Sequence, residues 1–124
     1  MDEVNTLLKK SAEAIDDALL LIEHHRNEAA ANRSYYSLFY SIQALLLSVN
    51  EVPKTHKGMH IRFYELFIKS GIFAEEISQN AQALLNLRQE GEYDLEDLSD
   101  EIIQEAKAKT EKVLQVIHQQ MNKA

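Results

Sequence analysis

Arg88 is placed by its spacing where a charged side chain is unusual. Ile77, Ala81, Leu84 and Arg88 follow one another at intervals of four, three and four residues, which is the apolar line of a helix. A guanidinium on such a face needs a partner, because burying an unpaired charge is costly. Arg88 therefore either meets a phosphate, whose geometry suits its planar group, or forms an internal ion pair with a nearby carboxylate.

A second arginine, Arg33, lies on a similar line of the preceding long helix, with Tyr36 and Tyr40. For Arg33 we favour a structural ion pair. If successive helices alternate in direction, Arg33 near the start of the second helix and Arg88 near the end of the fourth should lie at opposite ends of the molecule. We therefore do not expect the two arginines to share a site.

A local basic patch surrounds the start of the expected third helix. Lys54 and Lys57 lie beside His56 and His60 in a chain whose formal net charge is −7. Lys54 and Lys57 could hold a phosphate there, because the first backbone N–H groups of a helix are free to bind anions. The alternative is a solvated face of ordinary mixed charge. The negative net charge opposes broad, sequence-independent binding to nucleic acid.

His56 and His60 are four residues apart, the spacing that places two imidazoles on one helix face in metal sites. The sequence identifies no third ligand and contains no cysteine, so we expect neither a metal site nor a cofactor. The tyrosines, including Tyr35, are expected in the core or an interface with hydroxyls that reach water.

The elements that carry these residues are predicted to be five helices. Apolar residues recur at helical spacing over about 2–26, 28–50, 55–70, 74–90 and from 100 to near the C-terminus. The predicted boundaries rest on N-caps and helix-ending residues: Pro53, Thr55, Gly71, Gly91 and Ser99. Short connections favour antiparallel neighbours. We predict a single all-α domain over 1–124, an antiparallel up-and-down bundle of four to five helices.

The location of the protein is predicted from its first residues and its apolar runs. The start, Met-Asp-Glu-Val, lacks the basic region and apolar core of a secretory signal. The longest apolar stretch, residues 35–49, is interrupted by Ser37, Ser41 and Gln43 and is shorter than a membrane-spanning helix requires. We expect a cytoplasmic protein with no membrane contact.

Several segments together resemble the small prokaryotic HEPN proteins. They are residues 31–39, 44–46, 54–58, 67–71 and 87–88 with 91–94. The resemblance implies an antiparallel helical bundle that forms a homodimer. It also implies an association with a minimal nucleotidyltransferase, because such proteins are often encoded beside one in toxin–antitoxin pairs.

The resemblance includes a departure at the expected catalytic motif. Active HEPN ribonucleases carry an Arg and a His with four to six residues between them. Arg88 matches the arginine, but Tyr93, Asp94 and Leu95 fill the three places for the histidine. A tyrosine with a pKa near 10 is a poor base at neutral pH. In related toxins a tyrosine near this motif accepts a nucleotidyl group from the partner enzyme, so the resemblance gives Tyr93 that role here.

Three hypotheses follow for the function. The preferred one is a non-catalytic HEPN module that dimerises and binds a nucleotidyltransferase or a nucleotide, with Arg88, Lys54 and Lys57 meeting phosphate. The second is a divergent RNA-cutting toxin that uses Arg88 with Tyr93 and Asp94. The third is a structural adaptor in which Arg88 forms an internal ion pair.

Overall fold

The computed structural model describes residues 2–93 and 98–123, with the backbone alone described for 89–93. These residues form five α-helices: α1 (Asp2–Glu23), α2 (Asn27–Ser48), α3 (His56–Phe63), α4 (Glu75–Tyr93) and α5 (Asp100–Met121). A π-helical turn, η1 (Tyr64–Ile68), continues α3 directly. The prediction of an all-α bundle is confirmed.

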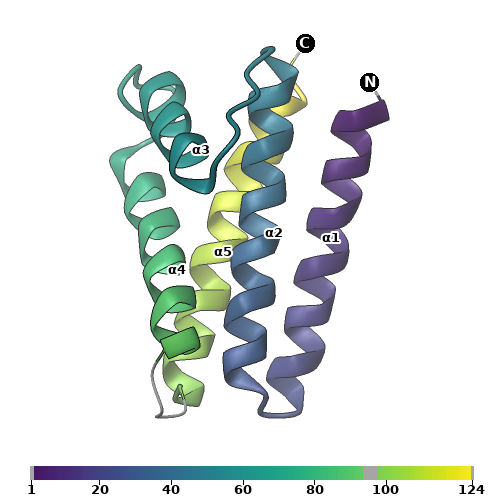
Figure 1. Cartoon of the computed structure of the whole chain (residues 1–124), viewed down its shortest axis with the longest axis vertical. Coiled ribbons are helices and arrows are strands. Elements are labelled where there is room, and N and C mark those ends of the chain that lie inside the picture. The colour runs from purple at the N-terminus through teal and green to yellow at the C-terminus, as the bar shows by residue number, and fades with distance from the viewer. Residues whose placement is uncertain (1, 94–97, 124) are drawn as a thin grey trace.

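The four long helices run alternately down and up, and both termini lie at one end of the bundle (Figure 1). The short helix α3 lies at that same end, so it does not add a full-length helix to the alternation. As a result α2 and α4 run in opposite directions. The start of α2 and the end of α4 therefore lie at the same end of the molecule, and the expectation that Arg33 and Arg88 lie at opposite ends is wrong.

Small polar residues fix the contact between α1 and α2. Ser11 Oγ donates to the Ser37 carbonyl at 2.7 Å, and Ser37 Oγ donates to the Ser11 carbonyl at 2.8 Å. Both serines are buried, as are Ala14 and Ala18 on the same face of α1. Small side chains let the helices approach closely, and the reciprocal bonds specify their register. Among the described residues, no helix has the length and apolar character needed to cross a membrane.

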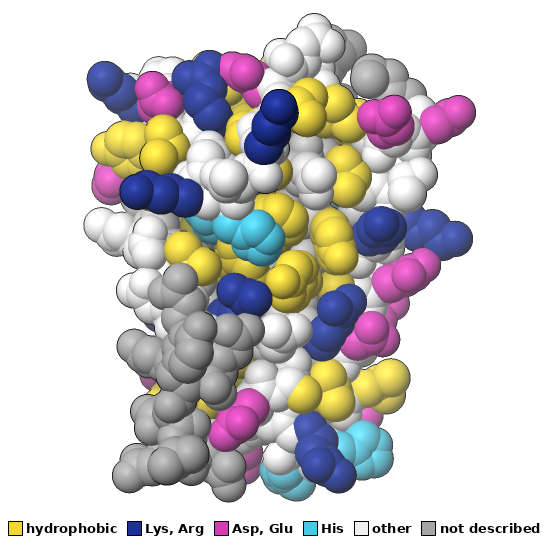
Figure 2. Space-filling view, in the orientation of Figure 1, with side chains coloured by type: hydrophobic (Ala, Val, Ile, Leu, Met, Phe, Trp, Pro, Cys, Tyr) yellow, Lys and Arg dark blue, Asp and Glu magenta, His cyan; other side chains and the backbone are white. Residues whose placement is uncertain are grey.

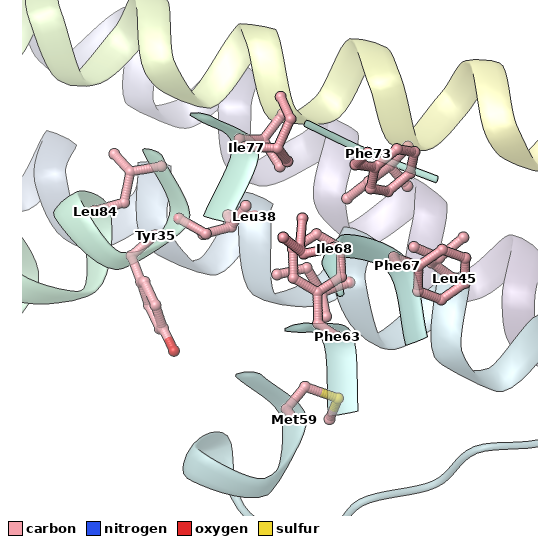
Figure 3. Packing of buried hydrophobic residues seen from close by; sticks show 14 of the residues in the cluster. Tyr35, Leu38, Leu45, Met59, Phe63, Phe67, Ile68, Phe73, Ile77 and Leu84 are labelled. Carbon is pink, nitrogen blue, oxygen red and sulfur yellow. The ribbon is translucent and has the colours of Figure 1, made fainter. Parts of the chain in front are cut away.

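The core lies between α2, η1, the following loop, α4 and α5 (Figure 3). Phe67 and Phe73 stack with ring centres 5.6 Å apart, and Phe63 lies 6.0 Å from Phe73. In η1 the Lys69 N–H donates to the Tyr64 carbonyl at 2.8 Å, five residues back. This wider turn buries both Phe67 and Ile68, although they are adjacent in sequence.

Most of the predicted helix boundaries are confirmed. Thr55 Oγ1 accepts from the Gly58 N–H at 2.9 Å, Ser99 Oγ accepts from the Ile102 N–H at 3.1 Å, and Gly71 has a positive φ of 87°. The predicted end of the fourth helix at Gly91 is wrong, because α4 continues to Tyr93. A glycine inside a helix costs only about 1 kcal/mol relative to alanine, which neighbouring interactions can offset.

Candidate phosphate-binding site

Tyr35 lies at the edge of the core and joins α2 to α3. The residue is fully buried, and its hydroxyl points away from Leu38 and Leu84, toward α3 (Figure 3). The hydroxyl oxygen lies 3.1 Å from His56 Nδ1 and 3.0 Å from His60 Nε2. The four-residue spacing of the histidines therefore serves to hold both imidazoles on one phenol.

The shared hydroxyl gives the two imidazoles different roles. A phenol has one proton, so the Tyr35 hydroxyl can donate to only one ring nitrogen and must accept from an N–H of the other. Burial raises the pKa of Tyr35 to about 12, although Arg88 acts in the opposite direction. Burial also lowers the pKa of His60 and of His56 below the ordinary 6.5. At neutral pH the phenol is protonated and both imidazoles are uncharged.

Arg88 lies against the same two tyrosines from α4. Its Nη2 donates to the Tyr36 hydroxyl at 3.2 Å, and its Cζ lies 5.2 Å from the ring centres of both Tyr35 and Tyr36. The two rings meet edge to face, with centres 5.6 Å apart. A guanidinium over aromatic rings is attracted by their quadrupoles. The side chain is thus oriented while remaining partly open to solvent.

His56 packs between aromatic side chains at the surface. Its ring stacks on Phe39 with centres 4.0 Å apart and planes at 14°, and it meets Tyr36 edge to face. We call the residues that meet here the Arg88 cluster: Tyr35, Tyr36, Phe39, His56, His60 and Arg88. Figure 2 shows imidazoles near the middle of one face, between hydrophobic side chains and close to Lys or Arg.

The other residues predicted for the site lie around this cluster. Lys54 and Lys57 are exposed and flank His56 in the sequence, at the start of α3. Tyr93 is the last residue of α4 and has no described side chain, whereas Asp94 lies outside the described residues. The alternative of an ion pair between Arg88 and a carboxylate such as Glu92 or Asp94 also falls on side chains outside the described part.

Arg33 has a different environment from Arg88, although both lie toward the same end of the bundle. Arg33 Nε lies 3.8 Å from Asp17 Oδ2 on α1, in a partly exposed ion pair. The favoured ion-pair role of Arg33 is confirmed. Arg88 instead contacts Tyr36, which lies one helical turn after Arg33 on α2.

Sequence reasoning missed the role of Tyr35 and the link between His56 and Arg88. The four-residue spacing of His56 and His60 is typical of helical metal sites, so it did not point to a shared tyrosine partner. The expectation that the tyrosine hydroxyls reach water is wrong for Tyr35, whose hydroxyl bonds two imidazoles. The signal available in the sequence was the pair His56 and His60, one helical turn apart and without a third metal ligand.

The chemical capacity of the cluster follows from its groups. Arg88 supplies a positive charge, and the N–H donors of its planar guanidinium match the geometry of phosphate oxygens. Burial and Arg88 lower the pKa of His56, so its imidazole is uncharged at neutral pH, and a bound anion would favour its protonated form. Tyr36 and Phe39 are partly exposed, and an aromatic ring can stack on a nucleobase. The arrangement suits a phosphate that carries an organic group.

Comparisons with known proteins agree with the resemblance noted in the sequence. A family model described as HEPN domain matches residues 4–120. A UPF0332 protein of Thermotoga maritima is 32% identical over 110 residues, which cover 88% of this chain and 83% of the relative. The protein named "Putative toxin MJ0142" of Methanocaldococcus jannaschii is 32% identical over 92 residues, covering 74% of this chain and 63% of the relative. The part of this chain that matches the family model contains all residues of the Arg88 cluster.

Proposed function

The chain belongs to the HEPN family, and from this premise we propose that it is a toxin-type HEPN module that binds the phosphate of a nucleotide or RNA at Arg88 without cutting it. Support for the toxin type comes from two relatives of Methanocaldococcus jannaschii, the proteins named "Putative toxin MJ0142" and "Putative toxin MJ0605". The assignment to a toxin-like HEPN module rests on the family match together with these names.

The position of Arg88 is the observation that carries the proposal. The guanidinium is held by the Tyr36 hydroxyl and by two ring faces, and the residue is only partly buried. An oriented cation at a surface loses little conformational entropy when it binds an anion, which favours affinity. Lys57, exposed beside His56 at the start of α3, and Lys54 add positive charge next to the cluster.

The proposed assembly is a homodimer that associates with a minimal nucleotidyltransferase. In this arrangement Tyr93, five residues after Arg88 on α4, is the acceptor of the transferred nucleotidyl group. Incubation with the cognate transferase and ATP should add one nucleotidyl mass on Tyr93, and Tyr93→Phe should abolish the adduct.

Light scattering of the purified chain should give the mass of a dimer. A monomer would contradict the proposed homodimer, and an adduct on another residue would contradict Tyr93 as the acceptor.

A second function, cleavage of RNA, is favoured by one observation. His56 and Arg88 contact the same two tyrosines, so an imidazole that can accept a proton lies near the cation. In this alternative Arg88 stabilises the charge of the transition state, with Tyr93 and Asp94 as further groups of the site. Expression should then slow growth, and Arg88→Ala should relieve the effect. Absence of toxicity in the parent chain counts against cleavage.

The binding proposal is tested by calorimetric and thermal-shift titrations with ATP, GTP and a short RNA. A ligand that binds the folded state alone should raise the melting temperature, and Arg88→Ala should abolish the rise. Arg33→Ala is the matched control, because Arg33 is also an arginine toward this end of the bundle but pairs with Asp17. Equal binding by the parent and Arg88→Ala, or no binding by either, would overturn the proposal.

A further inference from the structure

We propose that His56 is a second phosphate ligand of the Arg88 cluster and that it binds as an imidazolium, so that each phosphate bound takes up one proton. This inference rests on the proposed function, because it assumes that phosphate binds at Arg88. It adds a residue, a charge state and a pH dependence to that site. The ligand class is a phosphodiester or phosphomonoester.

His56 has one ring nitrogen held by the protein and one that can meet a ligand. Nδ1 lies 3.1 Å from the Tyr35 hydroxyl oxygen, which fixes one edge of the ring. Within the described residues no hydrogen bond to Nε2 is found, and the side chain is partly exposed. His56 is also the first residue of α3, whose positive end favours an anion. The ring can therefore present an Nε2–H group to a ligand.

His56 and Arg88 belong to the same aromatic cluster. Both side chains pack on Tyr35 and Tyr36: the His56 ring centre lies 6.0 and 6.1 Å from the centres of these rings, and Arg88 Cζ lies 5.2 Å from each. Arg88 also contributes to lowering the pKa of His56, after burial. The shared rings and this electrostatic effect place both groups in one cluster, and the proposal requires that one anion contact both.

The Tyr35 hydroxyl limits how many protons the two histidines can hold. If His56 becomes an imidazolium, its Nδ1–H donates to the Tyr35 oxygen, and the Tyr35 proton is donated to His60 Nε2. Every one of these polar atoms then has a partner. If His60 were protonated as well, both rings would donate to Tyr35, and the buried phenolic proton would lose its acceptor. The cluster therefore accepts one proton and resists a second.

His56 is surrounded by uncharged and cationic groups. The phenols of Tyr35 and Tyr36 on α2, His60 on the same helix and Arg88 on α4 lie around it, and the exposed Lys57 follows it in the sequence. Among the described residues no carboxylate pairs with His56. In the empty site these neighbours disfavour an imidazolium. A bound phosphate reverses the balance, because its negative charge favours the protonated ring.

The linkage is tested by calorimetry with a short 2′-O-methyl oligoribonucleotide that lacks terminal phosphates. Its phosphodiesters do not titrate near neutral pH, and it has no free 2′-hydroxyl, so any protons taken up belong to the protein. Titrations at about pH 7 in two buffers of different ionisation enthalpy should give uptake approaching one proton. Between the pKa of free His56 and its higher pKa in the complex, affinity should rise about tenfold for each unit that the pH falls.

Variants separate this inference from the proposed function. His56→Gln should bind more weakly and take up no proton, whereas His60→Gln should retain most of the uptake. Circular dichroism shows whether each variant is folded, and the pKa of His56 measured by NMR in the parent, with and without oligonucleotide, needs no variant. Binding that depends on Arg88 without proton uptake would overturn the inference and leave the proposed function standing. Absence of binding to the parent would overturn both.

Discussion

The Tyr36 hydroxyl accepts a hydrogen bond from Arg88 Nη2 at 3.2 Å, and this contact joins the first half of α2 to the end of α4. It exists because α2 and α4 run in opposite directions, so residues 52 positions apart in the sequence meet. The Tyr36 ring also lies 5.2 Å from the Arg88 Cζ. One side chain thus orients the cation that we propose binds phosphate.

Tyr36→Phe should weaken oligonucleotide binding without unfolding the protein. The substitution removes the hydrogen bond but keeps the ring under the guanidinium, so the loss should be about 1 kcal/mol, roughly fivefold in the dissociation constant. Tyr40→Phe is the matched control, because Tyr40 is also partly buried on α2 but lies near Lys10. Calorimetric titration of both variants is the measurement. An equal loss in the two variants would contradict the orienting role of Tyr36.

Tyr35→Phe should alter both histidines at once. Without the hydroxyl, His56 Nδ1 and His60 Nε2 lose their common partner, and the free energy of unfolding should fall by about 1 kcal/mol. Urea unfolding at pH 7 measures this loss. The ¹⁵N shifts of both imidazoles should also change, because the hydroxyl no longer fixes which ring nitrogen carries the proton. Unchanged shifts in both rings would refute the shared hydrogen bonds.

Stability should fall as the solution becomes more acidic than about pH 6.5. The pKa values of His56 and His60 are lowered in the folded protein, so the unfolded chain binds more protons in this window. Protonation therefore favours unfolding as the pH falls through 6.5 toward the folded pKa values. Urea unfolding from about pH 7.5 to 5.5 measures the slope. The double variant His56→Gln/His60→Gln should flatten it, and an unchanged slope would contradict this assignment.

The reciprocal bonds between Ser11 and Ser37 should be strongly coupled. Ser11→Ala or Ser37→Ala alone leaves a buried carbonyl with one partner fewer, at a cost of about 1–3 kcal/mol. The double variant should cost less than the sum of the two, because each serine is both donor and acceptor for the other. Chemical unfolding of all three variants gives the coupling energy.

Ser41→Ala is the control for this cycle. Its hydroxyl is also buried on α2 but has no hydrogen-bond partner among the described residues. This substitution should therefore be neutral or slightly stabilising. A cost comparable to that of Ser37→Ala would show that helix packing, and not the reciprocal bonds, sets the effect.

The sequence predicted the helices well because their signals are local. Thr55 and Ser99 cap their helices as expected, and Gly71 adopts the positive φ expected of a helix-ending glycine. The position of Arg88 on an apolar line was also readable, since it depends only on helical periodicity. The prediction that the fourth helix ends at Gly91 is wrong because a glycine ends a helix only when the residues after it cannot continue the hydrogen bonding.

The composition of the site was less predictable because it depends on how helices meet. The short α3 reverses the direction expected of α4, which brings Arg88 to Tyr36 and not to the opposite end from Arg33. Likewise, the hydroxyl of Tyr35 meets His56 and His60 only through the packing of α3 on α2. Periodicity within one helix contains no information on either contact.

The most direct test of phosphate binding at Arg88 is an NMR titration that follows arginine side-chain N–H resonances as the 2′-O-methyl oligoribonucleotide is added. The Arg88 resonance should shift and saturate with the same dissociation constant as the calorimetric titration, while that of Arg33, paired with Asp17, should stay in place. If Arg88 remains unshifted at concentrations that saturate the protein, phosphate binds elsewhere and the account is contradicted.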